Sequence, residues 1–132
     1  MELRTIISGL NFPEGPVFDF DGNLWFVEIK GGNLSCWDGK QLTRFDVDGA
    51  PNGAMVDRNG CIWFCDSGRG EIRLFNPVRH SFQTICNSTI EGKHLVRPND
   101  LIFDAKGNLL FSNHADGRKE PLSSICVLAK GV

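Results

Sequence analysis

The chain has 132 residues, of which 41% are hydrophobic, and it carries a formal net charge of −2 at pH 7. This length and composition are enough for one ordinary hydrophobic core, so we expect a globular domain. The near-neutral charge, without long runs of Lys or Arg, argues against nucleic acid or an anionic membrane as a partner. No segment approaches the roughly 20 apolar residues that a membrane span needs.

The cysteines also restrict the class of protein. There are five of them, an odd number, and residues 1–10 lack the pattern of a secretory signal. Reduced thiols in a cytoplasmic protein fit these observations better than a disulfide framework does. We therefore predict a cytoplasmic location.

Three segments align with one another without a gap, at 13–28, 51–66 and 98–113, and the first of them reads PEGPVFDFDGNLWFVE. Their first residues are 38 and 47 positions apart, a period typical of propeller blades and of two-helix solenoids. Each segment contains an apolar run, an Asp, a turn with Gly and a second apolar run. Because Gly allows the positive φ of a tight hairpin, each segment is predicted to form two antiparallel strands.

Further strands are predicted behind these segments, at 33–38, 41–47, 71–77, 81–86 and 123–129. The first two repeats thereby reach four strands each, whereas the third lacks its fourth. One more strand is predicted at 3–8 (LRTIIS), before the first repeat. This spare strand has no place within the first repeat.

We therefore predict an all-β fold, a partial β-propeller of about three four-stranded antiparallel blades. The single domain spans 1–132, with blades at approximately 9–48, 49–90 and 91–132. Propellers commonly have about four to eight blades, so three fill only part of a ring. We expect either further C-terminal blades or a homodimer of six blades in which two copies exchange the strand at 3–8.

The first residues of each innermost strand face the central channel of a propeller, so equivalent positions converge on one pocket. Here they are Glu14, Asn52 and Asn99. All three offer oxygen ligands, which suit a hard cation such as Ca²⁺ or Mg²⁺. The alternative is that these residues only stabilise local turns, as polar residues beside Pro and Gly often do.

The motifs FPEGPVF, PNG and RPND, at 12–18, 51–53 and 97–100, resemble those that open the first three blades of the SMP-30/gluconolactonase-like family. The resemblance covers most of the chain and implies half of a six-bladed propeller. It implies a lactone hydrolase that acts on a lactone or sugar-like small molecule and binds one divalent cation. Ca²⁺ is the expected ion, with Zn²⁺, Mg²⁺ or Mn²⁺ as alternatives. Single motifs of this kind also suit NHL-repeat propellers, so a noncatalytic module that binds a protein or carbohydrate remains the alternative.

The resemblance also implies roles for single residues. Glu14 matches the family's metal-binding glutamate of the first blade, and Asn99 matches an asparagine on the substrate side. Arg97 matches an arginine that contacts substrate, and Asn52 matches a pocket position that varies. The family's aspartate base and its remaining metal-binding asparagine belong to later blades that this sequence does not contain. We therefore predict that the monomer alone is inactive.

Overall fold

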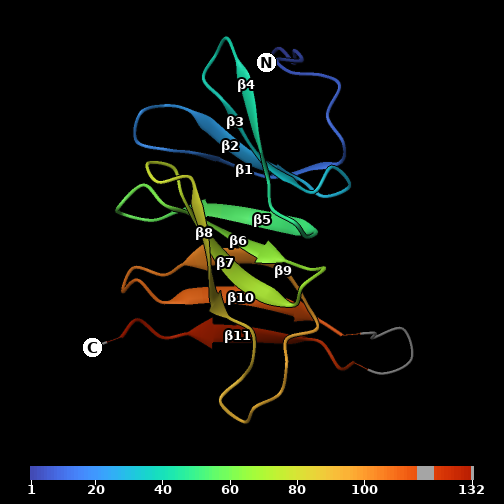
Figure 1. Cartoon of the computed structure of the whole chain (residues 1–132), viewed down its shortest axis with the longest axis vertical. Helices are drawn as coiled ribbons and strands as arrows, with labels where there is room; N and C mark the ends of the chain where they lie inside the picture. Colours follow the sequence, from blue (N-terminus) through green and yellow to red (C-terminus); the bar gives the residue numbers. More distant parts are fainter. Residues whose placement is uncertain (116–120, 132) are drawn as a thin grey trace.

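The computed structural model describes residues 1–115 and 121–131, and in these residues it contains strands and no helix (Figure 1). A helix able to cross a membrane is accordingly absent from this part of the chain. The predicted all-β fold is confirmed. The strands are β1 (Pro13–Phe18), β2 (Leu24–Glu28), β3 (Asn33–Trp37), β4 (Leu42–Asp46), β5 (Pro51–Val56), β6 (Ile62–Asp66), β7 (Glu71–Asn76), β8 (Ser81–Cys86), β9 (Arg97–Phe103), β10 (Leu109–His114) and β11 (Ser124–Leu128).

The strands form three antiparallel sheets, each built from neighbours in the sequence. The first sheet has the order β1-β2-β3-β4, the second β5-β6-β7-β8 and the third β11-β10-β9. The sheets follow one another along the long axis of the molecule, with the two termini at opposite ends (Figure 1). The predicted third blade, 91–132, includes residues 116–120 and 132, which lie outside the described residues.

An aspartate closes the first hairpin of every sheet. One of its carboxylate oxygens accepts two backbone N–H bonds across the turn, and the other accepts a side-chain N–H. In the first two sheets that side chain is an indole, which donates from Trp25 to Asp19 at 2.9 Å and from Trp63 to Asp57 at 2.8 Å. Such Asx-type bonds fix the turn locally, which explains why the same Asp recurs in the sequence repeat.

The second strand of the middle sheet, β6, is apolar on both faces because it lies between the first and third sheets. In β6, Ile62 and Phe64 join the core shared with the first sheet, whereas Trp63 and Cys65 contact the core shared with the third. Sheets stacked in this way bury each other's faces, and each buried aromatic or aliphatic side chain contributes about 1.5–3 kcal/mol. The core therefore lies between the sheets.

The segment 3–8, predicted as a strand, does not form one. A strand needs a partner that exchanges backbone hydrogen bonds with it, and the described chain offers none at this place. Leu3 is fully exposed, while Ile6 and Ile7 line a shallow hollow of about 260 Å³ against Leu24 and Phe26 of the first sheet. The predicted exchange of this segment between two copies would therefore require it to become a strand on association.

Candidate functional site

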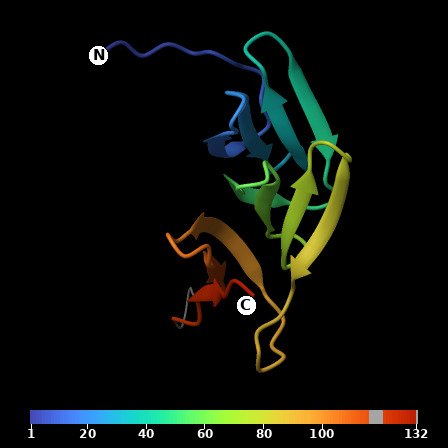
Figure 2. The same ribbon diagram turned by 90° about the vertical axis from the view of Figure 1, so that its left-hand side faces the viewer.

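The inner strands β1, β5 and β9 are neighbours, with β5 packed between the other two. β1 and β5 lie on the side of the molecule away from the outer strands β4 and β8 (Figure 2). Two glycines with positive φ allow the close approach. A Cβ atom at Gly15 (φ +60°) would lie 2.5 Å from the backbone nitrogen of Ala54, and one at Gly53 (φ +59°) would lie 2.7 Å from the carbonyl oxygen of Asn99. Only glycine fits these two contacts.

The predicted site residues stand directly beside these contacts. Glu14 precedes Gly15, Asn52 precedes Gly53, and Asn99 itself contacts Gly53. In each sheet the register between the first two strands shifts at this point, which marks a β-bulge. Bulges commonly re-aim side chains near functional sites. The three residues are therefore brought to the same end of three neighbouring strands.

The side chains of these residues are available to a ligand. Glu14 and Arg97 are exposed, and Asn52 and Asn99 are half-buried. Among the described residues, none donates to or accepts from the side chains of Glu14, Asn52 or Asn99 by a hydrogen bond. Polar groups without an internal partner are free to bind a cation or a substrate. Their roles as ligands remain predictions.

The sequence reasoning missed Asp100. It occupies in the third sheet the position that Gly15 and Gly53 hold in the first two, and Gly53 approaches its Cα atom. The signal was present, because the strands open with Pro-Glu-Gly, Pro-Asn-Gly and then Pro-Asn-Asp. Asp100 is exposed, and its backbone N–H donates to the hydroxyl of Ser112 at 3.1 Å. It adds a second carboxylate to this end of the strands.

Acidic side chains alone do not make a metal centre here. In residues 1–115 and 121–131, no three His, Cys, Asp or Glu side chains are grouped closely enough to share an ion. A cation at the ends of the inner strands would therefore also need the amide oxygens of Asn52 and Asn99. Oxygen donors of this kind match the preference of Ca²⁺ and Mg²⁺.

A second set of polar residues holds the strands that carry the candidates. Glu28, Asp66 and Asn113 are the last aligned residues of the three repeats. Each accepts backbone N–H bonds from the chain that leads into the inner strand of its own sheet. The carboxylate of Glu28 accepts from the nitrogen of Asn11 at 2.8 Å, and that of Asp66 accepts from Ala50 at 3.1 Å. These bonds fix the start of each inner strand.

Two of these residues are buried acids with an arginine partner. Glu28 is 1% exposed and accepts from Nε of Arg44 at 2.8 Å. Burial by itself would raise the pKa of Glu28, but hydrogen bonds from Arg44, the backbone of Asn11 and Ser35 lower it to about 2. Asp66 is fully buried and accepts from Arg73 at 2.9 Å. These acids are saturated by internal partners, which suits a structural role.

Comparison with known proteins identifies the family of this chain. The family model described as SMP-30/Gluconolactonase/LRE-like region matches residues 12–131. The gluconolactonase of Zymomonas mobilis is 27% identical over 128 residues, which cover 84% of this chain and 35% of that protein.

Solved structures give the same fold. A gluconolactonase from Xanthomonas campestris has a TM-score of 0.74 at 23% identity, over 85% of this chain and 38% of that one. The calcium-binding protein regucalcin from Agrobacterium tumefaciens has a TM-score of 0.60 at 18% identity, over 91% of this chain and 47% of that one. The chain thus spans less than half the length of these proteins. Its fold is a partial β-propeller, and the chain belongs to the SMP-30/gluconolactonase/LRE-like family.

Proposed function

We propose that this chain is a divalent-cation-dependent lactone hydrolase unit of the gluconolactonase type, which requires further blades or a second copy for activity. One observation carries the proposal: the contacts at Gly15 and Gly53 bring Glu14, Asn52 and Asn99 to the same end of three neighbouring strands. The name of the Zymomonas mobilis relative supports the lactone as substrate.

The side chains at the ends of the inner strands are of the right chemical type to bind a hard cation, but they are too few to complete its coordination. Glu14 offers a carboxylate, and Asn52 and Asn99 offer amide oxygens, whereas Ca²⁺ takes six to eight oxygen ligands. Waters and residues outside this chain would supply the rest. The cation, when bound, would polarise the carbonyl of a lactone. Arg97, exposed at the start of β9, would orient the substrate by donating to a hydroxyl or carboxylate.

The cation is tested by Ca²⁺ titration of thermal unfolding. At a Ca²⁺ concentration ten times the dissociation constant, the wild type should gain about 1.4 kcal/mol of stability. Glu14→Gln should lose most of this gain because it removes the negative ligand. Glu91→Gln, at an exposed loop residue, is the matched control and should behave as the wild type does. An equal gain in Glu14→Gln would overturn the assignment of Glu14.

A second copy is one way to complete the ring. The outer face of the first sheet exposes 66% of Phe18, and the outer face of the third exposes 60% of Ile102 and 64% of Val127. In a ring of two copies related by a two-fold axis, the first sheet of each copy would pack against the third sheet of the other. Both exposed faces would then be buried, and the ring would have six sheets. Light scattering should then show a dimer at micromolar concentration, with hydrolysis of gluconolactone detected as proton release. A monomer would rule out this arrangement and leave further blades as the requirement.

A further inference from the structure

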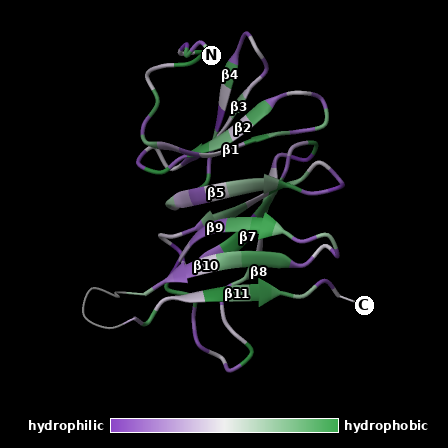
Figure 3. Cartoon of the chain, turned by 180° about the vertical axis from the view of Figure 1, so that it is seen from behind, coloured by the Kyte–Doolittle hydropathy of each residue, from purple (hydrophilic) through white to green (hydrophobic). Residues whose placement is uncertain are grey.

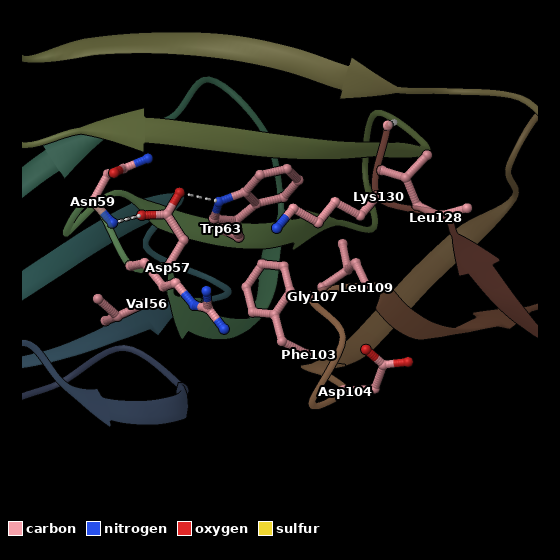
Figure 4. A pocket seen from close by; sticks show the side chains of 13 residues that line it. Val56, Asp57, Asn59, Trp63, Phe103, Asp104, Gly107, Leu109, Leu128 and Lys130 are labelled. Atoms are coloured by element: carbon pink, nitrogen blue, oxygen red, sulfur yellow. Dashed lines mark hydrogen bonds between the residues drawn. The ribbon is translucent and has the colours of Figure 1, made fainter.

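The second and third sheets meet differently at the two ends of their strands. At the end that carries the candidate residues, β5, β9 and β10 are hydrophilic (Figure 3). There Gly53 of β5 lies directly against the backbone of β9. At the opposite end, a cavity of about 430 Å³ lies between the hairpins at Asp57 and Asp104 (Figure 4). Contacts at the first of these ends therefore decide how β9 lies beside β5 at the candidate site.

Two serine hydroxyls bond to the backbone on either side of Asn99. The hydroxyl of Ser67, in the turn after β6, donates to the carbonyl oxygen of Pro98 at 2.6 Å. The hydroxyl oxygen of Ser112, on β10, accepts from the backbone N–H of Asp100 at 3.1 Å. The two peptide groups that flank the side chain of Asn99 are thus each held by a hydroxyl.

These bonds lie at the bulge of β9, where the regular ladder is interrupted. Pro98 pairs with Asn113 and Leu101 pairs with Phe111, so two residues of β9 stand opposite one residue of β10. A bulge leaves backbone groups without their ladder partners, and these groups need other partners when they are not in water. The hydroxyls supply such partners, and they thereby fix the direction in which this part of β9 presents its side chains.

The other repeats show that a blade of this kind does not require either hydroxyl. Ser67 takes the place of Ile29, and Ser112 takes the place of Val27 and Cys65. None of these three residues carries a hydroxyl, and in the first two sheets a glycine with positive φ lies at the bulge instead. The two hydroxyls are therefore a feature of β9, the strand that carries two of the candidate residues.

Ser67 also connects β9 with the neighbouring inner strand. Its backbone N–H donates to the carbonyl oxygen of Ala50 at 2.9 Å, two residues before Asn52. Its hydroxyl bonds to Pro98, one residue before Asn99. One residue thus joins the starts of two strands whose amide side chains must converge if they are to bind one ligand.

We propose that Ser67 and Ser112 are positioning residues, which hold the backbone of Asn99 so that its amide side chain faces the same ligand as that of Asn52. This inference rests on the proposed function, because it requires Asn99 to contact the cation or the substrate. The serines act through Asn99 and not on the ligand. A side chain that is already held in place loses less conformational freedom when the ligand binds, and this preorganisation increases affinity.

The first measurement needs no metal. In the double variant Ser67→Ala/Ser112→Ala, the backbone order parameter of Asn99 from NMR relaxation should fall from about 0.85, typical of rigid backbone, to below about 0.6. The amide of Asn52 should keep its value, because neither hydroxyl bonds to β5. The matched control is Ser81→Ala, which removes an exposed hydroxyl at the start of β8 and should change neither amide. An unchanged order parameter at Asn99 in the double variant would overturn the proposal.

The second measurement is the dissociation constant for Ca²⁺, obtained by calorimetric titration of the whole chain. Each single variant, Ser67→Ala or Ser112→Ala, keeps one of the two bonds and should bind Ca²⁺ about threefold more weakly, the fold-change expected for about one net hydrogen bond. The double variant should bind about tenfold more weakly. Ser67→Thr keeps a hydroxyl and should restore the affinity of the wild type.

The outcomes separate this inference from the proposed function. If the wild type itself does not bind Ca²⁺, the proposed cation site is refuted. If the wild type binds Ca²⁺ and the double variant binds it equally well, only the role of the two serines is refuted. A double variant that is less stable without metal but keeps its affinity would show that the hydroxyls serve the fold alone.

Discussion

Replacement of the buried carboxylate in Glu28→Gln should destabilise the chain by about 2–3 kcal/mol at pH 7. Glu28 accepts hydrogen bonds from Asn33 and Ser35 at 2.7 Å, as well as from Arg44 and the backbone of Asn11. Removing one partner of a buried ion pair typically costs about 3–5 kcal/mol. The side chain of Arg44 is 45% exposed, so water replaces part of the lost interaction and the cost is smaller. Urea unfolding at pH 7 measures the difference.

The pH dependence separates the charge of Glu28 from its packing. The pKa of Glu28 is about 2 in the folded chain against an ordinary value of 4.5, so the unfolded chain takes up the proton first as the pH falls. The stabilisation is therefore complete above about pH 4.5 and is lost toward pH 2, by at most about 1.4 kcal/mol per pH unit. The difference between wild type and Glu28→Gln should shrink over this range.

The matched control is Asp48→Asn, which also changes an acid to its amide. The side chain of Asp48 is 99% exposed and lies 3.7 Å from Arg69, so solvent screens this pair and little change is expected at any pH. If the stability difference caused by Glu28→Gln stays the same between pH 6 and pH 3, the charge of Glu28 does not stabilise the fold.

Two further pairs of substitutions test the packing. Gly53→Ala should lower the free energy of unfolding by at least about 2 kcal/mol, because its added Cβ would lie 2.7 Å from the backbone of β9 at a φ of +59°. Gly60→Ala, at a φ of +79° with open space around it, should cost only about 1 kcal/mol, and thermal unfolding compares the two. Trp25→Ala should cost about 3–5 kcal/mol, because Trp25 is 4% exposed and packs against Phe45 and Phe75. Trp63→Ala should cost less, because Trp63 is only half-buried, and equal losses of stability in urea would contradict this difference.

The hairpins of this fold were predictable because their signals are local. An Asp, a Gly at positive φ and a following apolar run fix each turn within a few residues, as at Asp19 and Gly22. The repeat then predicted the number of strands in each sheet from the same pattern. β11 was found in the same way, since the run around Cys126 is apolar and follows a polar loop.

The remaining features depend on contacts that are distant in sequence. The segment 3–8 has the composition of a strand, but its conformation is decided by whether a partner strand is present. Similarly, the sequence shows Glu28 only as the last residue of a predicted strand. Its hydrogen bond with Arg44, sixteen residues away, shows that the charge of its carboxylate is compensated within the chain. The repeat aligns Asp100 with Gly15 and Gly53, but it does not reveal the backbone contact with Gly53 that places Asp100 beside the other candidate residues.

The first repeat places an acid at each end of its aligned segment, at Glu14 and Glu28, and the structure separates the roles of these two positions. At the end of the second strand, Glu28 and Asp66 are buried and fully bonded within the chain, so their charge is already compensated. At the start of the inner strand, Glu14 is exposed, and its carboxylate makes no hydrogen bond within the described residues. Loss of charge at Glu28 should therefore reduce stability with or without Ca²⁺, whereas loss of charge at Glu14 should matter only when Ca²⁺ is present. A Glu14→Gln variant that is destabilised without metal would show that this carboxylate serves the fold, and would remove the basis for a cation at the ends of the inner strands.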